Sequence, residues 1–276
     1  PYNIYGGMQD NGSWAGPAYT WRVQGIRNSY WQEISFGDGF DVLPDPNNHR
    51  FGISASQEGS AVIYDRITGN NEGIQPTHPE RKEKLRFNWN AAMNRDPFNS
   101  NTLYFGSQFV HKSIDGGQTW RIISKDLTTN NPEYQKQGES GGLTMDATGA
   151  ENYCTILVIE PSPVQKGLLW TGSDDGQVNI TENGGDDWQN ITKNIPMPSG
   201  AWINQIKASH HNPSEALLVV NDYRRFNDAP MVYRTKDFGQ SWKQIVDKND
   251  VISYALCILQ DPIEPNLYFL GTGDGL

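Results

Sequence analysis

Carboxylates in short glycine-containing turns are the residues of this chain whose type and spacing suggest catalysis. Asp38 lies in the tetrapeptide Gly-Asp-Gly-Phe, Asp10 precedes an Asn-Gly pair, and Asp175 precedes a glycine. Hydrolysis of a glycosidic bond needs two carboxyl groups held about 5–10 Å apart. If the chain is an enzyme, we predict that Asp38 is catalytic and that Asp10 or Asp175 is its partner. Each of these aspartates could instead only shape its own turn.

Aromatic, amide and charged side chains cluster near the same turns and could form a binding surface. Aromatic rings pack on the apolar faces of sugars and peptides, whereas carboxylates, amides and guanidinium groups bind their polar groups. The predicted ligand-binding residues are Gln9, Asp41, Asn88, Trp89, Asn90, Glu151, Tyr153, Asp174, Trp202, Asn204, Arg224, Arg225 and Tyr254, with Asp274 as a further acidic turn residue.

The composition argues against several other functions. The chain has 276 residues and a net charge of −10, and Glu83 interrupts its basic cluster at residues 81–86. Nucleic-acid binding needs clustered lysine and arginine, so we expect no nucleic-acid partner. Cys154 and Cys257 lie in apolar segments without further ligands at metal spacing, which predicts buried free thiols, no metal and no cofactor. No segment has the roughly 20 apolar residues of a membrane helix, so we expect no membrane insertion.

The elements that would position these residues are indicated by an internal repeat. Residues 113–120, 181–188 and 235–242 share the pattern [ST]-x-[DN]-x-G-x-[STD]-W, and a short β-like run follows each tryptophan. The third residue can accept hydrogen bonds from its own turn, the glycine allows a positive φ, and the tryptophan can pack between neighbouring units. We therefore predict structural roles for the third and last residues of each copy, which are Asp115, Trp120, Asn183, Trp188, Asp237 and Trp242.

A second repeated element precedes each copy. An apolar strand, a turn with proline after a polar residue, and a second strand often ending in glycine recur along the chain, for example around residues 96–106 and 261–271. Each unit thus has four strands, A to D, which predicts an all-β fold: a β-propeller of four-stranded antiparallel blades. We expect one domain over residues 1–276, with about four full and two partial blades. The chain would then be a portion of a larger propeller with about seven or more blades.

Propeller topology separates the loops into two faces. The C–D turns with the repeated motif lie on one face, here called the bottom. The B–C loops and the D-to-A crossovers lie on the other, the top, where long insertions are expected at residues 68–86, 126–150 and 221–230. Long loops gathered on one rim of a rigid scaffold often carry function, although they could also be ordinary solvated loops. The predicted binding residues lie on this top face.

The repeated turns resemble the BNR, or Asp-box, repeat of sialidases, sortilin-type (Vps10) receptors and xyloglucanase-like glycoside hydrolases. Residues 5–14, 85–90 and 171–176 are similar to segments of bacterial sortilin-like proteins, many of which are labelled glycosyl hydrolase. This resemblance implies a non-catalytic interaction propeller that binds a peptide, protein or glycan on its top face or in its tunnel. It also implies a secreted, periplasmic or cell-surface location and contacts with the rest of the parent propeller.

The alternative is a glycoside hydrolase related to xyloglucanases, because the surroundings of Asp38 resemble those of a xyloglucanase acid. A sialidase is disfavoured, since the chain has no Arg-Ile-Pro signature. The repeat supports the binding propeller and no catalytic constellation contradicts it, so we favour a binder over an enzyme.

Overall fold

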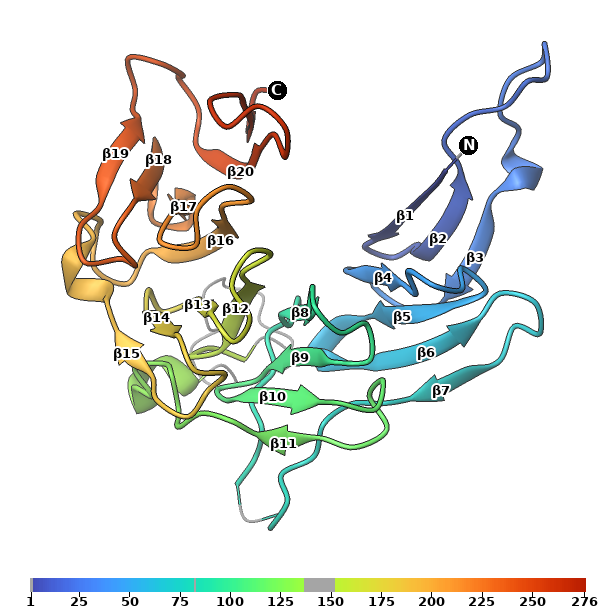
Figure 1. Ribbon diagram of the computed structural model, residues 1–276, viewed down its shortest axis with the longest axis horizontal. Coiled ribbons are helices and arrows are strands. Elements are labelled where there is room, and N and C mark those ends of the chain that lie inside the picture. The colour runs from blue at the N-terminus through green and yellow to red at the C-terminus, as the bar shows by residue number, and fades with distance from the viewer. Residues whose placement is uncertain (1, 82, 137–151) are drawn as a thin grey trace.

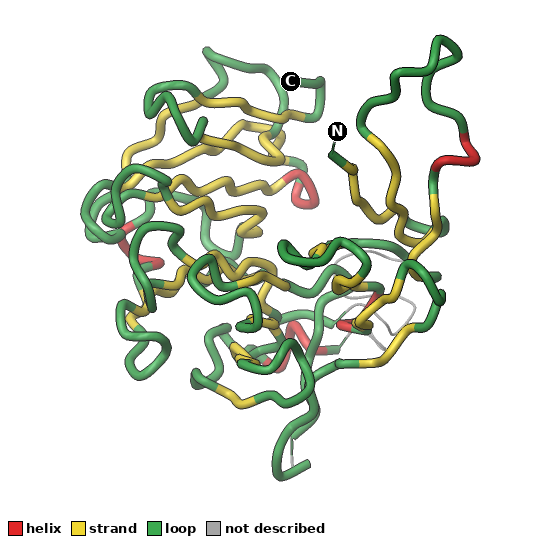
Figure 2. Tube along the Cα trace, turned by 45° about the vertical axis from the view of Figure 1, so that its right-hand side comes forward, coloured by secondary structure: helices red, strands yellow, loops and turns green. Residues whose placement is uncertain are grey.

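The computed structural model describes residues 2–81, 83–136 and 152–276. In this part of the chain the strands form six antiparallel sheets, and each sheet contains strands consecutive in sequence. The sheets follow one another around an arc, with the first strand of each full sheet near the centre and the last at the periphery (Figure 1). Loops and short helical turns connect the strands (Figure 2). This arrangement confirms the predicted all-β propeller with partial blades.

The blades are numbered here in chain order. Blade 1 contains β1 (Asn3–Met8), β2 (Gly12–Pro17) and β3 (Gln32–Ser35). Blade 2 contains β4 (Val42–Pro44), β5 (Phe51–Ala55), β6 (Ala61–Asp65) and β7 (Asn71–Gly73). Blade 3 contains β8 (Met93–Arg95), β9 (Leu103–Gly106), β10 (Val110–Ser113) and β11 (Arg121–Ile122).

The remaining blades follow in the same order. Blade 4 contains β12 (Ile156–Pro161), β13 (Leu169–Ser173), β14 (Val178–Thr181) and β15 (Gln189–Asn190). Blade 5 contains β16 (Trp202–Ala208), β17 (Ala216–Asp222), β18 (Asn227–Thr235) and β19 (Lys243–Val246), and blade 6 contains β20 (Ala255–Gln260) and β21 (Tyr268–Thr272). The 3-10 turns are η1 (Asn28–Tyr30), η2 (Gln57–Gly59), η3 (Pro132–Gln135), η4 (Thr192–Asn194) and η5 (Tyr223–Arg225).

The turns between the first two strands of a blade repeat one hydrogen-bond pattern. A side-chain oxygen accepts from the backbone N–H groups two and three residues later, as Asp96 does from Phe98 and Asn99 at 2.8 and 3.0 Å. This local bond explains why a short polar residue comes before the turn. The accepting residues of the five turns are Asp45, Asp96, Ser162, Ser209 and Asp261.

Glycines near the ends of second strands allow neighbouring blades to approach. A Cβ atom added to Gly172 would lie 2.2 Å from a side-chain carbon of Ile203, in the first strand of the next blade. At Gly106 the added Cβ would lie 3.0 Å from Ile156, again in the next blade. The core is accordingly a series of clusters between blades, such as the one that joins Trp170 of blade 4 to Trp242 of blade 5.

The three copies of the repeated motif form C–D turns with matching hydrogen bonds. In the first copy, the Asp115 carboxylate accepts from the Thr119 backbone N–H at 2.9 Å and hydroxyl at 2.6 Å, and the Ser113 hydroxyl accepts from Gly117 N–H at 2.8 Å. These bonds hold the pKa of Asp115 down at about 2. Because the side-chain oxygens of Ser113 and Asp115 accept bonds from within the turn, the motif stabilises the hairpin.

The tryptophans of the motif contact the preceding blade. The indole N–H of Trp120 donates to the carbonyl of Ile74 at 2.7 Å, and that of Trp188 donates to the carbonyl of Ile123 at 2.8 Å. Trp242 instead packs edge-on against Trp170. Each motif therefore joins its own hairpin to the neighbouring blade.

Two predicted loops and one thiol differ from expectation. The predicted insertion at 68–86 contains strand β7, and the one at 221–230 is mostly strand, because β17 continues to Asp222 and β18 begins at Asn227. Of the insertion at 126–150, residues 137–150 lie outside the described part. Cys154 is buried but precedes β12 with a positive φ of 59°, whereas Cys257 is exposed on β20.

Candidate functional site

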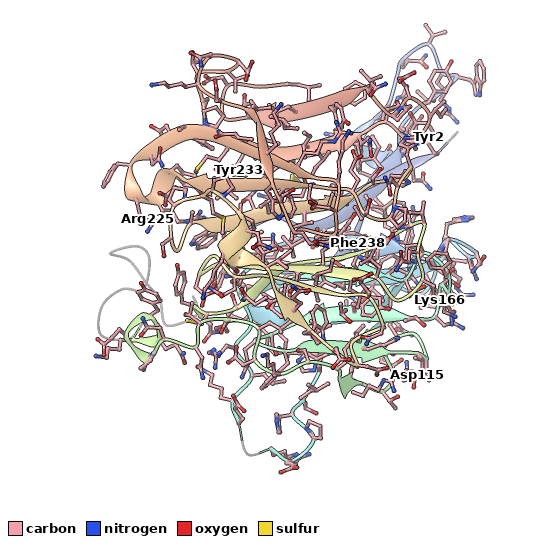
Figure 3. All side chains as sticks on the ribbon, turned by 60° about the vertical axis from the view of Figure 1, so that its left-hand side comes forward. Tyr2, Asp115, Lys166, Arg225, Tyr233 and Phe238 are labelled. Atoms are coloured by element: carbon pink, nitrogen blue, oxygen red, sulfur yellow. The ribbon has the colours of Figure 1, made fainter. Side chains whose placement is uncertain are left out.

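Loops from several blades meet on one face of the propeller. Arg225, in the turn between the second and third strands of blade 5, lies on the opposite side of the molecule from Asp115, which lies in a C–D turn (Figure 3). The two classes of loop therefore occupy opposite faces, and the face that contains Arg225 is the top. On this face, the hydrogen bonds and ring contacts described below lie over blades 4, 5 and 6.

Asp174 is the buried centre of this region. It is fully buried, and its carboxylate accepts hydrogen bonds from the Thr155 backbone N–H at 2.9 Å, the Thr155 hydroxyl and the Asn88 side-chain amide at 3.1 Å. Burial raises the pKa of Asp174 to about 8, with a further increase from the neighbouring carboxylate of Asp175. Asp174 thus ties the segment entering blade 3 to two segments of blade 4.

Asp175 is used in a similar way. Its carboxylate accepts from the backbone N–H and hydroxyl of Thr129 at 2.7 and 2.6 Å, and from the hydroxyl of Ser173 at 2.5 Å. Only 1% of Asp175 is exposed. The bonds hold the crossover from blade 3 against blade 4, so this carboxylate has a structural partner for each oxygen and little contact with solvent.

A column of rings and one guanidinium group runs across the top face. We call it the top-face column, and its members are Tyr134, Tyr153, Trp202, Arg224, Tyr223 and Tyr254. It begins on the crossover into blade 4, crosses blade 5 and ends at the entrance to blade 6. Residues that are up to 120 positions apart (134 to 254) therefore form one continuous contact surface.

The central contact of the column joins one cation, Arg224, to two aromatic rings. The Arg224 guanidinium carbon lies 3.6 Å from the centroid of the Trp202 ring and 4.6 Å from that of Tyr223. Tyr223 in turn stacks on Tyr254, with centroids 4.8 Å apart and planes 30° apart. Cation–π contacts of this kind hold the guanidinium group against the rings.

Tyr153 connects the column to the buried carboxylates. Its hydroxyl donates to the Asp174 carbonyl at 2.9 Å, and its ring lies 6.4 Å from that of Trp202 and 5.4 Å from that of Tyr134, measured between centroids. Burial raises the pKa of Tyr153 well above its usual value, so the phenol stays protonated as a donor. The ring is consequently fixed in position beneath the exposed part of the column.

Arg225 has a different environment from its neighbour. Its side chain pairs with Asp222 at 2.5 Å and donates to the carbonyl of Ser199 at 3.0 Å. These bonds tie the turn of blade 5 to the crossover before β16. The sequence predicts both Arg224 and Arg225 as ligand-binding residues, but only Arg224 is part of the column.

The predicted catalytic aspartates do not form an open pair. Asp38 is 8% exposed, and its carboxylate accepts from the backbone N–H of Asp10 at 2.8 Å, while its own N–H donates to Gln57 at 2.9 Å. Asp10 is exposed and has a positive φ of 60°. Asp38 therefore fixes the turn of blade 1 against the crossover to blade 2, whereas Asp175 is held within blade 4.

Other predicted residues lie apart from the column. Asp41 keeps accessible surface, but desolvation by the surrounding residues raises the pKa of its carboxyl, and Lys207 of β16 offsets only part of this increase. Gln9 and Asp274 are exposed on the tips of blades 1 and 6. Asn204 donates to the carbonyl of Leu256. Glu151 lies outside the described residues.

The segment before blade 3 contains three more predicted residues. Asn88 is buried and bonded to Asp174 and Thr155, Trp89 is partly buried, and Asn90 is exposed with its N–H bonded to the Asn88 side chain at 3.1 Å. Asn88 is thus part of the support for the site.

Two members of the column were not predicted. Tyr223 directly precedes Arg224, so its position in the same turn was an available signal. Tyr134 lies in a turn whose sequence gives no sign of the contact with Tyr153. Thr129 and Thr155, which hold the two buried aspartates, were also missed because neither residue type is distinctive.

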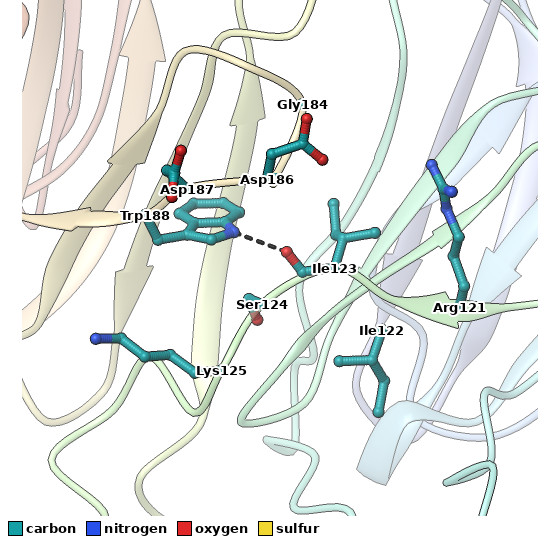
Figure 4. A pocket seen from close by; sticks show the side chains of 10 residues that line it. Arg121, Ile122, Ile123, Ser124, Lys125, Gly184, Asp186, Asp187 and Trp188 are labelled. Carbon is teal, nitrogen blue, oxygen red and sulfur yellow. Dashed lines mark hydrogen bonds between the residues drawn. The ribbon is translucent and has the colours of Figure 1, made fainter.

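A cavity of about 610 Å³ lies away from the column, between blades 3 and 4. It is bounded by residues 121–125 and by the C–D turn at residues 184–188, where Trp188 donates to Ile123 (Figure 4). It is a gap between structural elements, and a similar groove lies between blades 2 and 3 beside Trp120. We assign no ligand to either groove.

The described residues offer no evident metal site or membrane helix. No group of three or more histidine, cysteine, aspartate or glutamate side chains in residues 2–81, 83–136 and 152–276 is arranged to hold a metal ion. Within the same ranges, no helix has the length and apolar character needed to cross a membrane.

Comparison with known proteins gives the fold. No family model matches the chain, and no curated protein matches its sequence. A GH74 enzyme from Niastella koreensis is 16% identical over 98% of this chain and 39% of its own, with a TM-score of 0.59. YCF48 from Cyanidioschyzon merolae is 12% identical over 94% of this chain and 73% of its own, with a TM-score of 0.53.

A GH74 xyloglucanase from Xanthomonas campestris is 14% identical over 98% of this chain and 48% of its own, with a TM-score of 0.46. At these identities the similarity to the Niastella enzyme and YCF48 establishes a β-propeller fold and nothing about chemistry. The chain spans less than half the length of the two GH74 proteins.

Proposed function

We propose that this chain is a non-catalytic binding propeller that takes a glycan on its top face, at the top-face column. The observation that carries the proposal is the convergence of rings and one arginine from the loops of blades 4, 5 and 6. Tyr134, at one end of the column, is 48% exposed, and an exposed ring face is suited to stacking on a sugar. The buried bonds of Asp174 and Asp175 make the surface rigid, which reduces the entropy lost on binding.

The surroundings of the acidic residues support binding over hydrolysis. A general acid must reach the glycosidic oxygen, and a second carboxylate must reach the sugar or a water molecule. Asp38 and Asp175 instead accept hydrogen bonds from loop backbone and hydroxyl groups, and both are buried. Of the three predicted catalytic aspartates, only Asp10 is exposed. Hydrolysis by a xyloglucanase-type mechanism is therefore the weaker alternative.

The wider family assignment is part of the same proposal. The matching C–D turns at Asp115, Asn183 and Asp237 support a relation to BNR-repeat, sortilin-like propellers. Under this proposal the protein is exported, as a secreted, periplasmic or cell-surface protein, and the rest of its propeller packs against this chain.

A glycan array probed with the intact chain tests the binding function, and a peptide array serves as the competing test. Trp202→Ala removes the ring that supports Arg224 and should weaken glycan binding at least about tenfold. Trp21→Ala is the matched control, because Trp21 is 86% exposed in the loop between β2 and β3. Binding of peptides alone, or equal effects of the two variants, would contradict the proposal.

The enzymatic alternative has its own assay. Incubation with xyloglucan and other β-glucans, followed by measurement of new reducing ends, should show no turnover. Turnover that is lost in Asp38→Asn would establish the hydrolase instead.

A further inference from the structure

Arg224 is exceptional among the arginines that are buried at least in part. The other five each donate a hydrogen bond to an acceptor within the described residues, and they are Arg50, Arg66, Arg86, Arg95 and Arg234. The Arg224 guanidinium group lies over the rings of Trp202 and Tyr223, and no acceptor among the described residues is hydrogen-bonded to it. The N–H donors of this partly buried guanidinium group are therefore available to an acceptor on a ligand.

The nearby acidic groups are not available to fill this role. Asp174 is fully buried and already accepts from Thr155 and Asn88. Asp175 is bonded to Thr129 and Ser173, and Asp222 pairs with Arg225. The positive charge of Arg224 is therefore uncompensated by an ion pair within the described residues.

The rings also restrict how an acceptor can approach. The guanidinium carbon of Arg224 lies 3.6 Å from the centroid of the Trp202 ring and 4.6 Å from that of the Tyr223 ring. The N–H groups of arginine point outward in the guanidinium plane, where a carboxylate can accept two of them side by side. Because two rings already contact the guanidinium group and its N–H groups have no acceptor among the described residues, a planar, two-oxygen acceptor suits it better than a third ring.

We propose that Arg224 binds the carboxylate of a uronate residue in the glycan ligand, an inference that rests on the proposed glycan-binding function. A single uronate supplies the planar acceptor that the edge of Arg224 lacks. The net charge of −10 disfavours a densely sulfated chain, because long-range repulsion opposes the approach of many like charges. The ligand class is accordingly a glycan with isolated uronate residues.

Calorimetric titration of the chain with a panel of oligosaccharides tests this assignment. Each member has one glucuronate or galacturonate residue, and its matched control is the carboxyl-reduced form of the same oligosaccharide. We expect at least one acidic form to bind about tenfold or more tightly than its reduced form. Equal affinity for acidic and reduced forms would overturn the uronate assignment and leave the glycan-binding function in place.

Two variants locate the effect. Arg224→Gln should abolish the preference for the acidic form, and Arg224→Lys should restore only part of it, because lysine keeps the charge without the two-pronged geometry. Arg225→Gln is the matched control and should keep the preference. A preference that persists in Arg224→Gln overturns the assignment. A panel in which nothing binds also overturns it. In that case, binding of neutral glycans on the array still tests the glycan-binding function separately.

Discussion

Replacement of Trp188 by alanine should destabilise the propeller without affecting its top face. The indole N–H bonds to the carbonyl of Ile123 in the preceding blade at 2.8 Å, and the ring packs against the cluster between blades 3 and 4 (Figure 4). Removal of a fully buried tryptophan costs about 3–5 kcal/mol. Because Trp188 is only partly buried, we expect about 2–3 kcal/mol, of which about 1 kcal/mol comes from the hydrogen bond.

Thermal unfolding measures this loss. For a domain somewhat smaller than this chain, 1 kcal/mol corresponds to about 2–4 °C, so Tm should fall by about 5–10 °C. Trp188→Phe keeps most of the packing but loses the donor, and should lower the free energy of unfolding by about 1 kcal/mol. Trp21→Ala, at an exposed ring, should change it by less than about 0.5 kcal/mol.

Glycan binding should not depend on Trp188. Trp188→Ala should keep the wild-type affinity for glycans at a temperature where the variant is folded, because the C–D turn lies opposite the top-face column. An unchanged Tm would refute the structural role of the motif. A loss of affinity equal to that of Trp202→Ala, measured on folded protein, would refute the division of the two faces.

The remaining predictions concern a close contact and a buried carboxyl group. Gly172→Ala should destabilise the chain by about 1–3 kcal/mol, since its Cβ would lie 2.2 Å from Ile203, while Gly6→Ala, with nothing within 4 Å, should be near neutral in chemical denaturation. Equal effects would show that the contact is relieved by small shifts. Asp174, whose pKa is raised to about 8, contributes stability at low pH that is lost as pH rises from about 4 to about 8. Between pH 5 and pH 8, the unfolding free energy of Asp174→Asn should therefore decrease less than that of the wild type. The difference should be no more than about 1.4 kcal/mol per pH unit. Parallel pH profiles of the two proteins would contradict the raised pKa of Asp174.

The sequence alone predicted the features that depend on nearby residues. The bonds from Asp96 to Phe98 and Asn99, and from Asp115 to Thr119, span four residues or fewer, so the residue types at those positions suffice to indicate a turn. The recurrence of such turns between apolar strands predicted the blades. The strand-ending glycines were visible as well, although their cause, contact with the next blade, was not.

The tertiary structure decided how the candidate residues are used. Asp175 and Asp38 look like exposed turn residues in sequence, but both are buried: the crossover residue Thr129 bonds to Asp175, and Asp10 in the turn of blade 1 bonds to Asp38. The long loop predicted at residues 221–230 is wrong, because β17 and β18 stay paired as far as Asp222 and Asn227, close to the tip of the hairpin.

The top-face column is the feature that no local pattern contains. The residues beneath it, Asn88 and Asp174, are separated by 86 residues, and its rings of Trp202 and Tyr254 come from different blades. Their positions follow from how each blade packs on the next, which depends on the summed shape of many side chains. Sequence therefore determined the repeating unit and the residues at its turns, while the packing of blades determined which of those residues meet and which remain free to bind a ligand.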